Sequence, residues 1–256
     1  MNTNYVNLNL FSTANWQDED IESLVLLLDS RSSFRPEKWG FYEPLRSVFS
    51  RDVISDAQVR WKSKRGAILL FGINKYDVSM MIAKDLAFKR PNWISVNLKD
   101  EFFTDEKQIE AFLDFAKQLF AWGKMIYGYA SHRLAFERKN KLSVLTRIEG
   151  KLISIGGTDI RRCLPGIYWA NFFGDQYVNW FGENKFWNLP SYTQQDLPKG
   201  GRLILSSGSP LDYEQSVVAE RELSMRKELG ERAFFDIKNP TRSTDSPFKE
   251  GFIQIE

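Results

Sequence analysis

Residues 67–82 read AILLFGINKYDVSMMI and place two apolar runs, Ala67–Ile73 and Tyr76–Ile82, on either side of Asn74 and Lys75. Asparagine tolerates the positive backbone φ angle that a tight hairpin turn requires. Two apolar runs of this length, joined by such a turn, are typical of paired antiparallel strands. The stretch therefore predicts a β-hairpin.

The residues after the hairpin predict a third strand and then a long helix. In Trp93–Leu98, polar or aromatic side chains alternate with aliphatic ones, as in a half-buried strand. Thr104 is placed to cap a helix that Gly123 ends, and the apolar residues between them recur at steps of three and four: Ile109, Phe112, Leu113, Ala116, Leu119 and Phe120. Strands followed by a helix that packs across them predict an α+β fold. We expect mostly antiparallel sheets with helices packed on one face, rather than a βαβ series.

Patterns on both sides of this region predict further elements. The expected elements are a strand over Tyr5–Phe11, a helix from Asp18, a strand or a strand running into a helix over Met125–Phe136, a strand over Arg202–Leu205 and a helix over Tyr213–Leu229. A chain of 256 residues is long enough for one large domain or two small ones.

We expect a single α+β domain over residues 1–256. The polar, Gly-rich stretch 138–157 is the alternative boundary, and it would separate residues 1–137 from 158–256. Two related strand–helix halves are one interpretation of that arrangement, although no repeat of fixed period is visible in the sequence.

The composition excludes several kinds of chemistry. The chain has 20 Phe, 9 Tyr and 8 Trp, but one His and one Cys. A disulfide within the chain and a zinc site built from several His or Cys ligands are therefore impossible. Catalysis by a histidine would depend on His132, and catalysis by a thiol on Cys163. We expect no cofactor, no metal and no enzymatic activity.

Each of these two residues has a structural interpretation beside the catalytic one. His132 follows Ser131, but neighbours on a strand point to opposite faces, so they form a poor nucleophile–base pair. A half-buried strand histidine is the alternative. Cys163 follows Arg162, and nearby arginines can lower the pKa of a thiol. A buried, unreactive cysteine is the alternative for this position.

Carboxylate chemistry is the catalytic route that composition leaves open. The acidic clusters, however, lie at or just before predicted helix starts, where carboxylates complement the helix dipole: Asp18–Asp20, Asp100–Glu101 and Asp105–Glu106. Gly150-Lys151 lacks the other residues of a phosphate-binding P-loop, and Ser207 lacks the glycine pattern of a nucleophile elbow.

Two basic clusters raise the alternative of a nucleic-acid-associated defence or phage-related factor. One is 60–65, and the other lies within 133–147 and contains Arg133, Arg138, Lys139, Lys141 and Arg147. Basic side chains interleaved with aromatic ones grip single strands. A solvated basic face is the preferred interpretation of these clusters, and the net charge of +2 is low for a dedicated nucleic-acid binder. We expect nucleic acid not to be the partner.

The N-terminus lacks the basic and apolar regions of a signal peptide, and no run of about 20 apolar residues could cross a membrane. We therefore expect a cytoplasmic protein with no membrane partner.

Aromatic residues also gather in a stretch rich in helix and strand breakers, Phe34–Pro44. Loops lie at the surface, so Trp39 and Tyr42 either pin this loop to the core or face a partner.

The most distinctive stretch is Leu164–Val178, LPGIYWANFFGDQYV, in which a proline and a glycine precede a strand that ends in glycine before a helix. Together with Arg35-Pro36, Trp39-Gly40 and Tyr42-Glu43-Pro44, it resembles bacterial polymorphic-toxin immunity proteins, in particular the immunity protein 52 type. Leu229-Gly230 and Phe234-Phe235 are similar in placement.

This resemblance implies a cofactor-free α+β protein that binds a cognate toxin domain and blocks it by protein–protein contact. It makes the following residues the candidates for partner binding: Arg35, Trp39, Tyr42, Glu43, Tyr168, Trp169 and Asn171. If the toxin were a nuclease with a basic cleft, the acidic residues within Asp100–Glu110 would be the complementary surface.

Overall fold

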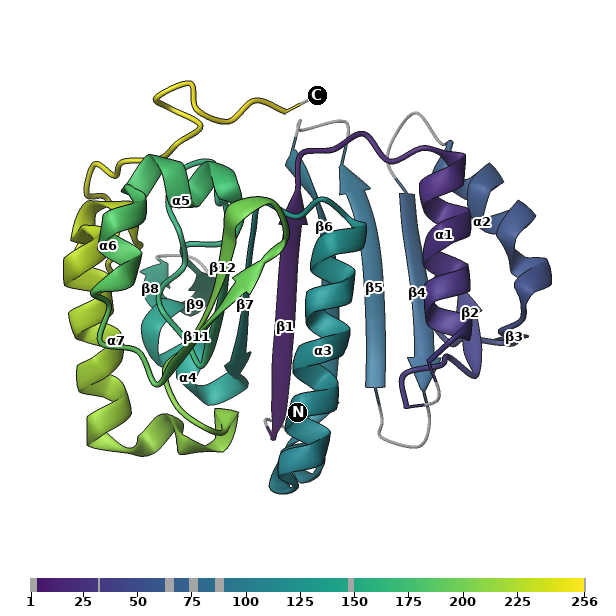
Figure 1. Ribbon diagram of the computed structural model, residues 1–256, viewed down its shortest axis with the longest axis horizontal. Coiled ribbons are helices and arrows are strands. Elements are labelled where there is room, and N and C mark those ends of the chain that lie inside the picture. Colours follow the sequence, from purple (N-terminus) through teal and green to yellow (C-terminus); the bar gives the residue numbers. More distant parts are fainter. Residues whose placement is uncertain are drawn as a thin grey trace. The chain divides into compact units, whose positions relative to one another are not determined.

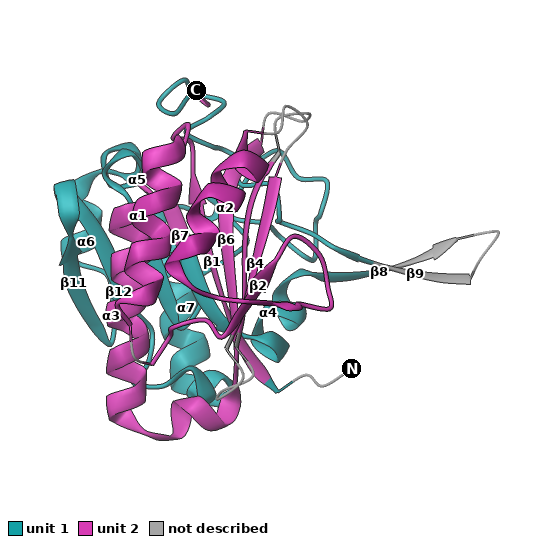
Figure 2. Cartoon of the chain, turned by 90° about the vertical axis from the view of Figure 1, so that its right-hand side faces the viewer, with its two compact units in different colours: residues 1–4, 129–254 teal, residues 5–128, 255–256 magenta. Residues whose placement is uncertain are grey.

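The computed structural model describes residues 4–31, 33–62, 67–73, 78–85, 90–146 and 150–255. The chain forms two compact units (Figure 2), unit 2 built on Tyr5–Gly128 and unit 1 built on Tyr129–Gln254. The stretch 138–157 lies inside unit 1.

Unit 2 contains an antiparallel sheet that includes the predicted hairpin. Its strands follow the order β1 (Tyr5–Ser12), β6 (Arg90–Lys99), β5 (Val78–Asp85), β4 (Ala67–Ile73), β2 (Lys38–Gly40) and β3 (Ser47–Val48). The hairpin prediction is confirmed, since β4 pairs with β5 and Leu70 lies opposite Met81. The predicted turn at Asn74 and Lys75 lies outside the described residues.

The helices of unit 2 lie on one face of this sheet, as Figure 1 shows for α1 and α3 in front of the strands. They are α1 (Asp18–Asp29), α2 (Ile54–Trp61) and α3 (Glu106–Trp122), with short 3-10 turns at Arg51–Val53 and Asp100–Thr104. Burial alternates along β1, where Val6, Leu8 and Leu10 are fully buried and the residues between them are half-exposed. The helices therefore cover the apolar face of the sheet.

The longest helix, α3, forms because its apolar stripe meets the sheet. Phe112 is fully buried, and the ring of Phe115 stacks on Phe34 at 4.4 Å between centroids. The helix begins one residue later than predicted, because the side chain of Asp105, not Thr104, accepts a hydrogen bond from the backbone of Lys107 at 2.9 Å.

A tryptophan cluster joins the ends of the three helices. The ring of Trp16 lies 5.7 Å from Trp61 and 4.9 Å from Trp122. Their indole N–H groups donate to the backbone carbonyls of Gly123, Trp16 and Asp20, respectively, each at 3.0 Å. Trp16 and Trp61 are buried and Trp122 is half-buried, and each indole satisfies its donor while it packs in the cluster.

Unit 1 holds a second set of strands and shorter helices. The strand order is β11 (Thr193–Leu197), β12 (Gly201–Leu205), β10 (Ala170–Phe173) and β7 (Tyr127–His132), where β7 contains the boundary between the units, and a separate hairpin joins β8 (Lys141–Thr146) to β9 (Gly150–Ile155). The helices are α4 (Arg133–Asn140), α5 (Asp175–Phe181), α6 (Glu183–Trp187) and α7 (Ser216–Leu229), with 3-10 turns at Pro198–Gly200, Pro210–Glu214 and Glu231–Ala233. The helix predicted from Tyr213 begins at Ser216, after one of these turns.

Every residue of β10 and β12 is buried. Strands of this kind are covered on both faces, unlike the sheet of unit 2. Antiparallel strands with packed helices in both units confirm the α+β fold class. In the described part of the chain, no helix has the length and apolar character needed to span a membrane.

The Phe112→Ala variant tests how much α3 contributes to stability. We expect the free energy of unfolding to fall by about 3–5 kcal/mol, because a fully buried ring is replaced by a cavity. Urea unfolding followed by circular dichroism measures the change. Glu110→Ala, at an exposed position of the same helix, is the control and should change the value by less than about 0.5 kcal/mol. Equal losses in the two variants would contradict the packing described for α3.

Candidate functional site

The structure places Tyr168, Trp169 and Asn171 in the interior of unit 1, where all three side chains are less than 5% exposed. The amide of Asn171 accepts from the backbone N–H of Tyr168 at 3.0 Å and donates to its carbonyl at 2.7 Å. The indole of Trp169 donates to the carbonyl of Ser207 at 3.2 Å. These side chains satisfy buried backbone groups just before and within β10, so they hold this irregular segment in place.

Tyr168 also belongs to a buried polar network. Its hydroxyl donates to the carbonyl of Pro165 at 3.2 Å and accepts from the side-chain amide of Asn140. The ammonium group of Lys139 lies 4.7 Å from the centre of its ring and donates to Glu222 at 2.5 Å. The network links α4, the segment before β10 and α7 inside unit 1.

Arg35 lies in unit 2 and shares one carboxylate with a second arginine. Asp29, the last residue of α1, accepts from Arg51 at 2.7 Å and from Arg35 at 2.9 Å. These two hydrogen bonds hold the pKa of Asp29 below its ordinary value. The guanidinium of Arg35 also lies 5.8 Å from the ring centre of Phe49. Arg35 therefore braces the loop that leads into β2.

The remaining sequence candidates lie in and after β2. Trp39 is 5% exposed and packs edge-to-face on Phe41 at 5.2 Å, so it pins the loop. Tyr42 is 77% exposed, and Glu43 is also exposed. Leu45 closes the loop back onto the sheet, since a Cβ placed on Gly72 would lie only 3.1 Å from its side chain. A pinned loop thus presents one tyrosine to solvent.

The loop borders a sheet face that the sequence analysis did not single out, and we call it the open face. It consists of the outward residues of the unit 2 strands in three register rows: Phe11, Trp93, Ala83 and Ile68; Asn9, Ser95, Met81 and Leu70; and Asn7, Asn97, Ser79 and Gly72. No described helix of unit 2 lies on this side of the strands (Figure 2). Most of its side chains are half-exposed, Ile68 is 39% exposed, and the small Ala83 between Trp93 and Ile68 is buried.

Side-chain amides on the open face bond to one another across the strands. Asn7 donates to Ser95 at 3.1 Å and to Asn97 at 2.5 Å. Asn97 in turn donates to Ser79 at 3.2 Å, and Asn9 donates to Asn7. The ladder holds these polar groups in place through hydrogen bonds within the chain.

One of the rows ends in a charged side chain and an exposed one at the edge of the sheet. Lys38 of β2 continues the row through Gly72, and Val48 of β3 lies opposite Lys38 and is 75% exposed. The centre of the open face carries amide, hydroxyl, aromatic and aliphatic groups without a charge. Alternation was the sequence signal for this face, because Asn7 and Asn9 of β1, and Trp93, Ser95 and Asn97 of β6, stand at every second position between aliphatic residues.

The basic clusters are largely occupied by carboxylates of the same chain. Their ion pairs are Arg133–Glu137 at 2.5 Å, Lys141–Glu137 at 2.9 Å, Lys139–Glu222 at 2.5 Å, Arg138–Glu214 at 3.7 Å and Lys62–Asp18 at 2.7 Å. Arg60 lies over the ring of Phe41 at 5.4 Å. Residues 63–65 and 147 of these clusters lie outside the described residues. The paired cations are less available to phosphate groups than the sequence suggests.

His132 and Cys163 have structural surroundings. His132 is 2% exposed, its Nδ1 accepts from the backbone N–H of Leu134 at 3.2 Å at the start of α4, and its ring stacks on Tyr213 at 4.1 Å. Cys163 is buried, and burial raises the pKa of its thiol. A raised pKa disfavours the reactive thiolate.

Carboxylates with a clearly shifted pKa are held in the ionised form. Lys141 and Arg133 lower the pKa of Glu137, as the arginines do for Asp29. A general acid requires the opposite shift. Among the described residues, no group of three or more His, Cys, Asp or Glu side chains is arranged to hold a metal ion.

Comparison with known proteins shows similarity to solved structures. No protein-family model and no curated protein matches the chain. A solved Pseudomonas aeruginosa T6SS protein, PA0821, is similar in structure with a TM-score of 0.51 and 8% sequence identity, over 86% of this chain and 72% of that chain. At this identity the likeness shows a shared fold.

The Asp29→Asn variant tests the paired arginines. Because the pairing lowers the pKa of Asp29, its stabilising effect is present above the ordinary carboxyl pKa and is lost as the pH falls through the lowered value. We expect the variant to be less stable than the natural chain at neutral pH, and the difference to shrink below a pH of about 4.

Urea unfolding at both pH values measures the effect. Glu22→Gln, an exposed position on the same helix, is the control and should show little difference at either pH. A loss of stability that does not depend on pH would show that the ion pairs are not its cause.

Proposed function

We propose that the chain is an immunity-type protein that binds a cognate bacterial toxin domain through the open face of unit 2 and neutralises it by contact. The observation that carries the proposal is the composition of that face. Half-exposed Trp93, Phe11 and Met81 lie beside an amide ladder with no charge at its centre. The cores of protein–protein interfaces are depleted in charge and enriched in aromatic residues and methionine.

The ladder lowers the cost of covering this face. An unpaired amide buried by a partner loses its hydrogen bonds to water, which costs free energy. Asn7 and Asn97 already bond to neighbouring side chains, so a partner can cover them while those bonds persist. The ladder also fixes the side-chain rotamers, which reduces the entropy lost on binding.

Tyr42 and Val48 extend the surface at the edge of the sheet. Both side chains are more than 70% exposed, and Tyr42 is carried by a loop that Trp39 and Leu45 pin. A rigidly presented tyrosine is a common anchor in protein interfaces. The ion pair of Arg35 with Asp29 anchors the start of this loop to α1.

The fold is compatible with a role in bacterial competition, since a protein of this fold is a T6SS protein. The resemblance of the loop and of the Leu164–Val178 stretch to polymorphic-toxin immunity proteins supports the same function. The first test is genetic. We expect the gene immediately upstream to encode a large secreted protein with a toxic C-terminal domain, and co-expression of the chain to rescue cells that express that domain. If the cells die equally with and without the chain, the immunity function is wrong.

The Met81→Arg variant tests the open face. Met81 lies opposite Ser95 near the middle of the face, so an arginine there would place an unpaired charge in the interface. We expect binding of the toxin domain to weaken by about 100-fold or more and protection to be lost. Isothermal titration calorimetry with the purified domain measures the change.

Two further variants make the result interpretable. Ser95→Arg should reproduce the loss, which guards against misfolding of the first variant. Glu110→Arg places the same charge on the exposed side of α3 and should bind normally. If both open-face variants are folded, as judged by circular dichroism, and still protect the cells fully, the toxin domain binds a different surface of the chain.

The Tyr42→Ala variant tests the anchor on the loop. We expect the affinity for the toxin domain to fall about 10- to 100-fold, as for an interface anchor, while the midpoint of thermal unfolding stays nearly constant because the ring is 77% exposed. Tyr192→Ala is the matched control, since Tyr192 is 59% exposed in unit 1. Equal affinities of the two variants would exclude the loop from the interface.

A further inference from the structure

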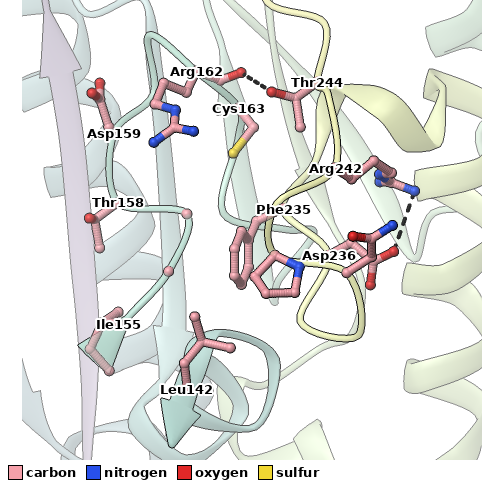
Figure 3. Close-up of a pocket in the computed structure, with 14 residues that line it drawn as sticks. Leu142, Ile155, Thr158, Asp159, Arg162, Cys163, Phe235, Asp236, Arg242 and Thr244 are labelled. Carbon is pink, nitrogen blue, oxygen red and sulfur yellow. Dashed lines mark hydrogen bonds and ion pairs between the residues drawn. The ribbon is translucent and has the colours of Figure 1, made fainter. Parts of the chain in front are cut away.

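Unit 1 contains a pocket of about 250 Å³ that the proposed function does not use (Figure 3). Two segments form its walls, 155–163 and 235–244. They are pinned to each other, because the hydroxyl of Thr244 donates to the carbonyl of Arg162 at 2.7 Å and the backbone N–H of Phe235 donates to the carbonyl of Leu164 at 2.8 Å. Hydrogen bonds between the two segments therefore hold the walls of the pocket in place.

The apolar floor of the pocket is the ring of Phe235. The ring packs closely against Gly156 and Gly157, since a Cβ on Gly156 would come within 2.1 Å of the ring. Leu142 and Ile155 extend the apolar wall. This side of the pocket suits a small hydrophobic group.

The carboxylates that line the pocket are already occupied. Asp159 accepts from the guanidinium of Arg161 at 2.8 Å on both of its oxygens. Asp236 pairs with Arg242 at 3.4 Å and accepts from the backbone of Lys238 at 3.0 Å. Each negative charge in the wall is thus balanced by one positive charge of the same unit.

The basic residues that line the pocket are Arg242, which pairs with Asp236, and Arg162. Figure 3 shows its side chain directed into the pocket beside the sulfur of Cys163. Among the residues that the structure describes, no carboxylate lies within ion-pair distance of its guanidinium. The hydroxyl of Thr158 lines the same space as a further donor. A guanidinium presents a planar set of donors that matches carboxylate and phosphate groups.

We propose that this pocket binds a small organic anion, with its carboxylate or phosphate on Arg162 and an apolar group on the ring of Phe235. The volume is just below the usual range for ligand pockets, about 300–1,000 Å³, so the ligand is small. The site lies within unit 1 and is independent of the toxin surface proposed on unit 2.

Cys163 reports on occupancy because it is the one cysteine of the chain and lines the pocket. A maleimide reagent can modify no other thiol in the protein. An anion bound to Arg162 would cover the sulfur, so it should slow this modification several-fold. Burial raises the pKa of the thiol, which makes the reaction slow enough to follow.

The experiment uses the full-length protein with benzoate, benzamide and inorganic phosphate as probes. Benzoate carries both the ring and the charge, benzamide the ring alone, and phosphate the charge alone. We expect benzoate at millimolar concentration to slow the modification of Cys163 and to raise the midpoint of thermal unfolding. Benzamide should do neither, and phosphate should act more weakly than benzoate. Equal effects of benzoate and phosphate would remove the apolar part of the proposal.

Variants identify the group that holds the anion. Arg162→Gln should weaken the benzoate effect about tenfold, the loss expected for one charge-assisted pair. Arg232→Gln is the control, because Arg232 is exposed and pairs with Asp245 outside the pocket. The proposal is overturned if neither anion changes the two readouts, if benzamide acts as benzoate does, or if Arg162→Gln responds like the natural chain.

Discussion

Alternate residues of a strand point to opposite faces of a sheet, and in unit 2 this constraint creates the core and the proposed binding surface together. Val6 and Leu8 face the helices and are fully buried, while Asn7 and Asn9 face away and are half-exposed. A shift of β1 by one residue would bury the asparagines among apolar side chains and expose the leucines. The stability of the core therefore fixes which side chains the open face presents.

Helices and strands with strong periodicity could be predicted from the sequence. Which of their faces are covered by other elements could not be predicted. The stripe on α3 and the hairpin of β4 and β5 each carry their own signal, and both are found. The alternation in β1 shows which residues share a face. It contains no information on what lies against that face, because the covering helices come from other parts of the chain. The open face became visible only with the topology.

The most distinctive motif in the sequence belongs to the interior for a related reason. Buried backbone outside regular structure must find its hydrogen-bond partners among side chains. Asn171 supplies them for Tyr168, and Trp169 does so for Ser207. These hydrogen-bonding requirements favour particular residues at fixed positions. The unusual sequence of this stretch therefore reflects its packing in the interior. Tyr42, in contrast, is exposed in a loop whose residues have few such demands, and its sequence signal is correspondingly weak.

Charge shows the same separation between neighbours in sequence and neighbours in space. Arg161 and Arg162 are adjacent, yet the first is held by Asp159 and the second faces a pocket. The basic residues of 133–147 look like a patch, but partners as distant as Glu222 neutralise them. What distinguishes a binding group is whether the chain itself satisfies it. The amides of the open face are satisfied by one another and can be covered by a protein at low cost. The guanidinium of Arg162 has no such partner within the described residues, and an anion is the ligand that supplies one.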